Sequence, residues 1–136
     1  MIKQTTHHIR GKDGFTLVEI LVVVLIVALL AAIVIPNLLR SRVNADDAAA
    51  QAALKAISTA LETYASKYNQ YPSDTTSLIN VTPPYLSVDY FTGTHSGFTF
   101  TSTITDTTYT IIANPVNANL GSGSFSISTS GVLVDH

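Results

Sequence analysis

One apolar segment constrains this chain more than any other feature of its sequence. Residues 15–35 read FTLVEILVVVLIVALLAAIVI, in which Thr16 and Glu19 are the only polar side chains. At about 1.5 Å per residue, a helix of this length spans roughly 30 Å, which matches the hydrocarbon core of a bilayer. We therefore predict a membrane-inserting helix over residues 15–36, and only the rest of the 136-residue chain is left to form a globular part.

The charges on either side of this segment differ in sign. Residues 1–14 contain Lys3, Arg10, Lys12 and one acid, whereas the chain as a whole has 7 basic and 9 acidic residues. A basic flank stays on the cytoplasmic side of a membrane span, so we predict that the amino terminus is cytoplasmic and that the carboxyl-terminal part faces outward. The net charge of −2 offers no basic surface for nucleic acid, and the absence of cysteine excludes disulfides.

Two single residues set this segment apart from a secretory signal peptide, in which a shorter apolar core is followed by small residues at the cleavage site. Gly14 instead comes directly before the apolar segment, so cleavage there leaves the whole helix on the mature protein. Glu19 places a carboxylate inside the segment, which is costly and generally marks a function. The alternative for Glu19 is a position close enough to the cytoplasmic interface to be solvated.

The octapeptide K-D-G-F-T-L-V-E, residues 12–19, resembles the prepilin signature shared by type IV pilins and the pseudopilins of type II secretion. It combines glycine at the cleavage position (Gly14), phenylalanine as the new first residue (Phe15), and glutamate at the fifth mature position (Glu19). Pro36 falls where many members of these families carry a helix proline. Asp13 departs from the commoner all-basic approach to the glycine.

The resemblance implies a processing route. A membrane prepilin peptidase would remove the cytoplasmic leader, residues 1–14, by cutting between Gly14 and Phe15, and would also methylate the new amine of Phe15. That amine stays largely protonated near neutral pH, so Glu19 of a neighbouring subunit is expected to neutralise it inside a filament core. Residues 32–37 around Pro36 are expected to act as a hinge, the alternative being a static kink.

The resemblance also implies partners: further copies of the chain, other pilins, the peptidase, and an inner-membrane assembly platform. The chain has no phosphate-binding loop, so the ATPase that powers assembly must be a separate protein. Before assembly the subunit is expected in the inner membrane, and after assembly in a filament at the cell surface or in the periplasm.

A second helical segment should continue the first. Residues 37–71 contain no glycine, and their alanine-rich sequence predicts an amphipathic helix that ends near Tyr68. Its apolar stripe should carry the head, and comprises Leu54, Ile57, Leu61, Tyr64 and Tyr68. The small side chains of residues 45–53 suggest a surface where neighbouring stalks approach closely, with Asp46 and Asp47 on a solvated face.

The remaining residues, 72–136, should form a loop followed by a small antiparallel sheet. Residues 72–96 are rich in turn formers, whereas residues 97–104, 108–115 and 124–136 favour strands, the last with a hairpin turn at residues 129–131. We therefore predict an α+β, pilin-like fold in which one long amino-terminal helix packs on three or four strands.

Catalysis finds no support in the sequence. His7 and His8 lie in the leader, and His95 and His136 are isolated, so we expect no metal, no cofactor and no enzymatic activity. The favoured function is a structural subunit of a type IV pilus-like filament. A pseudopilin of a type II secretion system is the main alternative, and a solitary membrane-anchored head that binds a ligand is a third.

Overall fold

The computed structural model describes residues 14–136, so the predicted leader lies outside the described residues except for Gly14. Its contacts divide the chain into two units, one that ends at Pro36 and one that runs from Asn37 to His136. We call the second unit the head.

Helix α1, Leu17–Tyr68, belongs to both units and contains 52 residues. The assignment continues through Pro36 without a break, and the hinge at residues 32–37 remains a prediction. The helix ends where Asn69 adopts a φ of 58°, a left-handed conformation that asparagine tolerates better than most residues. Its amide still donates to the carbonyl of Ala65 at 2.8 Å. The predicted helix end near Tyr68 is confirmed.

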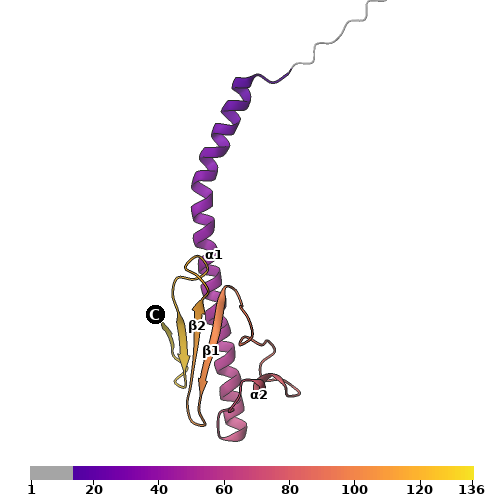
Figure 1. Cartoon of the computed structure of the whole chain (residues 1–136), viewed down its shortest axis with the longest axis vertical. Helices are drawn as coiled ribbons and strands as arrows, with labels where there is room; N and C mark the ends of the chain where they lie inside the picture. Colours follow the sequence, from indigo (N-terminus) through magenta and orange to yellow (C-terminus); the bar gives the residue numbers. More distant parts are fainter. Residues whose placement is uncertain (1–13) are drawn as a thin grey trace, which may run out of the picture. The chain divides into compact units, whose positions relative to one another are not determined.

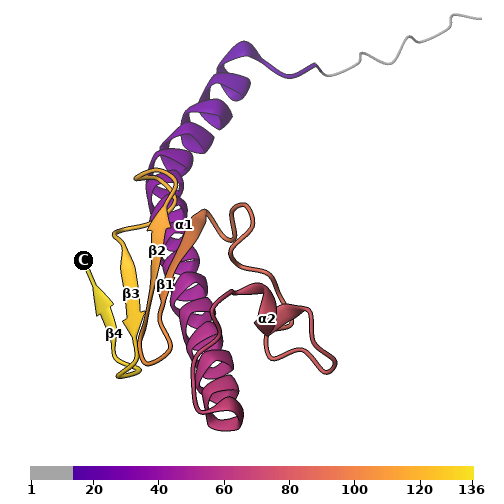
Figure 2. The ribbon, with the colours of Figure 1, turned by 60° about the horizontal axis from the view of Figure 1, so that its bottom comes forward.

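The head contains one four-stranded antiparallel sheet in the order β1-β2-β3-β4, which Figures 1 and 2 show beside the second half of α1. The strands are β1 (Phe98–Ile104), β2 (Tyr109–Pro115), β3 (Phe125–Ser128) and β4 (Leu133–Asp135). The predicted segment 124–136 thus forms a hairpin, in which Gly131 has a φ of 69° and donates to Ser128 at 2.7 Å. The predicted α+β layout is confirmed.

The core lies between α1 and the inner face of the sheet. Leu54, Ile57 and Leu61 of the predicted stripe have no exposed surface, while the alternation of the strands brings aromatic and aliphatic side chains to the same core: Phe98, Phe100, Tyr109, Ile111, Phe125 and Ile127. Tyr68 differs from the prediction because it is the last helical residue, stays 47% exposed, and packs on the ring of Tyr64 at 4.5 Å.

Two further details differ from the sequence-based prediction. Ala50 and Ala53 are buried against the head's own core, so the expected approach of neighbouring stalks is wrong for these two positions. The segment predicted as a loop also contains a short helix, α2 (Thr76–Ile79), which lies beside α1 in Figure 2 and buries Leu78. Four residues are too few to show a helical period in a sequence.

Tyr71 connects the segment between α1 and α2 to the rest of the head. Its amide donates to the carbonyl of Asp106, and its hydroxyl donates to Glu62 Oε1 at 3.0 Å. Burial, and then the hydrogen bond to Glu62, raise the pKa of Tyr71 to about 12. The phenol therefore remains neutral, and able to donate this hydrogen bond, throughout the physiological pH range.

Candidate functional site

The first turn of α1 is closed by a reciprocal pair of side chains, Thr16 and Glu19. The backbone amide of Glu19 donates to Thr16 Oγ1 at 3.2 Å, while Glu19 Oε2 accepts from the Thr16 amide at 2.7 Å and from the Thr16 hydroxyl at 2.9 Å. This is a capping box, which satisfies amide donors that a helix start otherwise leaves without partners. The carboxylate predicted to be functional is therefore held in a defined position.

Thr16 is a site residue that the sequence analysis missed. The signal was present, because Thr16-Leu17-Val18-Glu19 fits the pattern Ser/Thr-x-x-Glu/Gln that predicts a capping box. Both side-chain contacts use Oε2 of Glu19. Within the described residues Glu19 Oε1 accepts no hydrogen bond, so this oxygen is available to a group from outside the chain.

The first half of α1, up to Ile35, exposes its apolar side chains in the part of the chain that the structure describes. Every leucine, isoleucine and valine in residues 17–35 is at least 51% exposed. The most apolar window of α1 has a mean hydropathy of 3.3 and no buried side chain, and α1 is long and apolar enough to cross a membrane. An exposed apolar surface of this extent requires a bilayer or other protein chains to cover it.

Gly14 and Phe15 lie immediately before this helix. A methyl group added at Gly14 would meet no atom within 4 Å, so the fold places no steric demand for glycine at this position. Phe15 is 85% exposed. The structure thus brings Gly14, Phe15 and Glu19 together around the start of α1, whereas Pro36 lies at the far end of the apolar segment.

A comparison with known families identifies this region. Residues 9–35 match the family model described as the prokaryotic N-terminal methylation motif. The chain carries a methylation motif. This motif is typical of type IV pilins and pseudopilins and includes Gly14, Phe15, Thr16 and Glu19, so it supports a precursor of the pilin or pseudopilin type. Searches of curated proteins and of solved structures gave no significant match.

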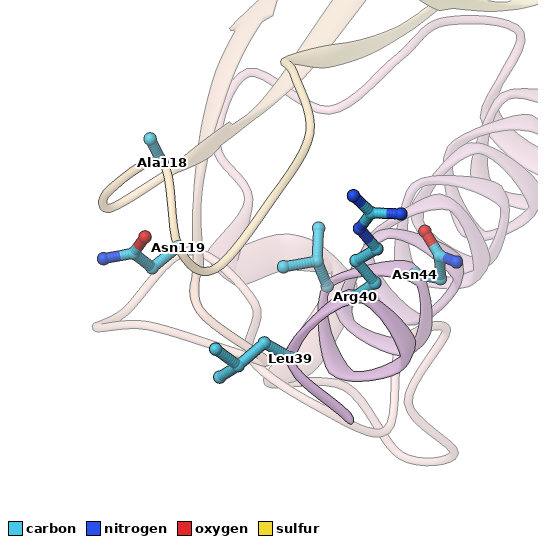
Figure 3. Close-up of a pocket in the computed structure, with 6 residues that line it drawn as sticks. Leu39, Arg40, Asn44, Ala118 and Asn119 are labelled. Atoms are coloured by element: carbon cyan, nitrogen blue, oxygen red, sulfur yellow. The ribbon is translucent and has the colours of Figure 1, made fainter. Parts of the chain in front are cut away.

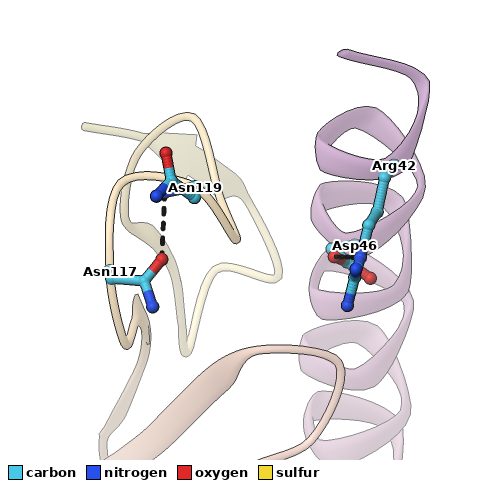
Figure 4. Close-up of polar contacts among 4 residues, drawn as sticks. All are labelled: Arg42, Asp46, Asn117 and Asn119. Atoms are coloured by element: carbon cyan, nitrogen blue, oxygen red, sulfur yellow. Dashed lines mark hydrogen bonds and ion pairs between the residues drawn. The ribbon is translucent and has the colours of Figure 1, made fainter. Parts of the chain in front are cut away.

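Beyond the methylation motif, one polar side chain of α1 contacts the loop between β2 and β3 within the head. Asp47 was expected on a solvated face, but it is only 8% exposed, and its Oδ1 accepts from the amide of Ser122 at 3.0 Å. The loop between β2 and β3 folds over this part of the helix and buries the carboxylate, which no pattern in the sequence indicated. In contrast, Asp46 is partly buried and forms an ion pair at 3.9 Å with Arg42, whose side chain is exposed (Figure 4).

Asp47→Ala is expected to lower the free energy of unfolding of the head by roughly 1–2 kcal/mol, because the hydrogen bond from Ser122 to the buried carboxylate is lost. Hydrogen exchange at residues 121–123 should accelerate, and urea unfolding of the detergent-solubilised chain measures the stability. Asp46→Ala is the matched control and should change stability by less than about 0.5 kcal/mol. Equal effects of the two variants would contradict the assigned role of Asp47.

Proposed function

We propose that the chain is a structural subunit of a type IV pilus-like filament, which is exported, cleaved, methylated and polymerised through its amino-terminal helix. The observation that carries this proposal is the methylation motif at the start of a helix whose leucine, isoleucine and valine side chains in residues 17–35 are all exposed in the single chain. A helical bundle formed by several copies would cover this surface after the subunit leaves the bilayer. The chain is then the substrate of a peptidase and methyltransferase and has no catalytic role of its own.

The geometry of Glu19 supports pairing between subunits. Cleavage after Gly14 creates a cationic amine at Phe15, next to the capping box formed by Thr16 and Glu19. Glu19 Oε2 is held by Thr16, and in the proposed filament Oε1 accepts from the amine of the neighbouring subunit. A charge pair of this kind in an apolar core fixes the register of one helix against the next.

The alternative is a pseudopilin, which serves a type II secretion system from a short periplasmic filament. The methylation motif is typical of both classes, and cleavage and methylation at Phe15 are expected in both. The two proposals differ in where the processed subunit accumulates. In either case an assembly platform in the inner membrane and its separate ATPase are the proposed partners.

Mass spectrometry of the amino terminus tests the proposal in two fractions, material sheared from cells and the membranes that remain. We expect a peptide that begins with methylated Phe15 to be abundant in the sheared fraction. Methylated Phe15 confined to the membrane fraction would favour the pseudopilin, and an intact Met1 in both fractions would exclude processing altogether. An outer-membrane protein followed in both fractions controls for contamination.

A further inference from the structure

A cavity of about 520 Å³ lies at the end of the head where α1 enters it (Figure 3). One wall is α1, and the other is the loop between β2 and β3. The cavity lies wholly within the head, and its lining residues are Leu39, Arg40, Val43, Asn44, Ala118 and Asn119.

The loop that forms the second wall is fixed by its own contacts. Asn117 Oδ1 accepts from the amide of Asn119 at 3.0 Å (Figure 4), and the amide of Leu120 donates to the carbonyl of Asn117 at 3.1 Å. Leu120 packs closely on Gly97, because a Cβ atom added at Gly97 would lie only 2.8 Å from the Cβ of Leu120. Together with the hydrogen bond from Ser122 to Asp47, these contacts hold the loop in place without a ligand.

The polar lining of the cavity consists of groups that suit an anion. Arg40 contributes a guanidinium with five donors and Asn44 contributes an amide group, whereas the side-chain amide of Asn119 points away from α1 (Figure 3). No carboxylate is among the described residues that line the cavity. Among residues 14–136 the only ion pair is Arg42 with Asp46, so Arg40 has no acidic partner there. Guanidinium groups bind phosphate oxygens in a bidentate manner, and amide N–H groups can complete the coordination.

The position of Arg40 in the sequence suggests where such an anion comes from. Arg40 follows Ile35, the last residue of the apolar segment, by five residues, or about 8 Å of helix. The headgroup layer on each side of a bilayer is about 5–8 Å thick, so the guanidinium reaches the depth of the lipid phosphates. Leu39 and Val43 add apolar surface to the same cavity. A phospholipid offers both chemistries, an anionic phosphodiester beside glycerol and acyl chains.

We propose that this cavity binds the phosphodiester of an anionic phospholipid in the leaflet from which α1 emerges, with Arg40 as the principal ligand. The proposal rests on the membrane-inserted state that precedes assembly in the proposed function. Nucleic acid fits less well, because a polyanion needs several cations and the lining residues in the described part of the chain offer one. The site would hold the head at the membrane surface until the subunit is extracted into a filament.

Native mass spectrometry of the full, uncleaved chain in detergent with added phosphatidylglycerol tests the site. The wild-type chain should retain one lipid, Arg40→Gln should lower retention about tenfold, and Arg40→Lys should restore part of it. Arg42→Gln is the matched control, because it removes an arginine two residues away that already pairs with Asp46, and it should retain lipid as the wild type does. Equal losses in Arg40→Gln and Arg42→Gln would overturn the proposal.

Two further measurements distinguish a bound lipid from a free phosphate and from a second copy of the chain. Soluble glycerol phosphate at the lipid concentration should not displace the lipid, and displacement would show that a free phosphate is bound instead. If Arg40→Gln dissociates dimers while lipid retention is unchanged, the occupant is a second copy of the chain, and the proposal is wrong. The assay needs neither cleavage nor polymerisation, so loss of the lipid site and failure of filament formation are separate results.

Discussion

Glu19→Gln is expected to reduce sheared filaments about tenfold or more while membrane insertion, cleavage and methylation continue. Glutamine is close in size to glutamate and can still accept hydrogen bonds from Thr16, but it has no charge to neutralise the amine of Phe15 on a neighbouring subunit. The uncompensated cation would then have to be buried among apolar helices. Immunoblots of sheared and membrane fractions measure assembly, and mass spectrometry of the amino terminus measures processing.

Thr16→Ala serves as the control for the capping box. It removes the hydroxyl that contacts Glu19 and loosens the first turn of α1, but it leaves the carboxylate in place. We expect Thr16→Ala to retain most filaments. Normal assembly of Glu19→Gln would contradict the pairing hypothesis, and equal loss in both variants would assign the effect to the helix start rather than to the charge.

Gly14→Val is expected to slow cleavage by roughly tenfold or more, so that the uncleaved precursor accumulates in the membrane. In the structure, an added Cβ at Gly14 meets open space, so the substitution should leave the fold of the chain intact. A branched side chain beside the scissile bond would instead obstruct an extended backbone that enters the narrow cleft of a peptidase. The ratio of precursor to mature chain on a gel gives the result.

Gly14→Ala provides a graded control for this experiment, because its single methyl group should allow partial cleavage. The circular dichroism of both variants should match that of the wild-type chain, since nothing contacts this position. Complete cleavage of the Gly14→Val variant would show that the peptidase does not require glycine at this position. Cleavage at a different bond would require the mature amino terminus to be reassigned.

The elements of the fold could be predicted where the sequence pattern and the burial of the side chains agree. The stripe of Leu54, Ile57 and Leu61 has a helical period and is fully buried, and the alternation along β2 matches its inward-facing Tyr109 and Ile111. The end of α1 followed from turn-forming residues after Tyr68. Each of these features depends on residues that are close together in the sequence, and periodic patterns carry information only over such short separations.

The features that escaped prediction depend on contacts between distant residues. Asp47 is buried by the loop that contains Ser122, 75 positions later, and a polar residue in an alanine-rich helix otherwise resembles any solvated one. Ala50 and Ala53 are covered by a sheet whose position no periodicity specifies. At the site, Gly14, Phe15 and Glu19 followed from a local motif, whereas the cavity around Arg40 needed the fold of the loop between β2 and β3.

The exposed helix and the separately packed head have a consequence for the fate of each subunit. Among residues 14–136 the hydrophobic core includes no residue before Ala50, while every leucine, isoleucine and valine of residues 17–35 is at least 51% exposed. Under the proposed function, a subunit that leaves a filament can return to the bilayer without unfolding its head. A disassembled filament would then replenish the membrane reservoir, and the cell could reuse its subunits without new synthesis.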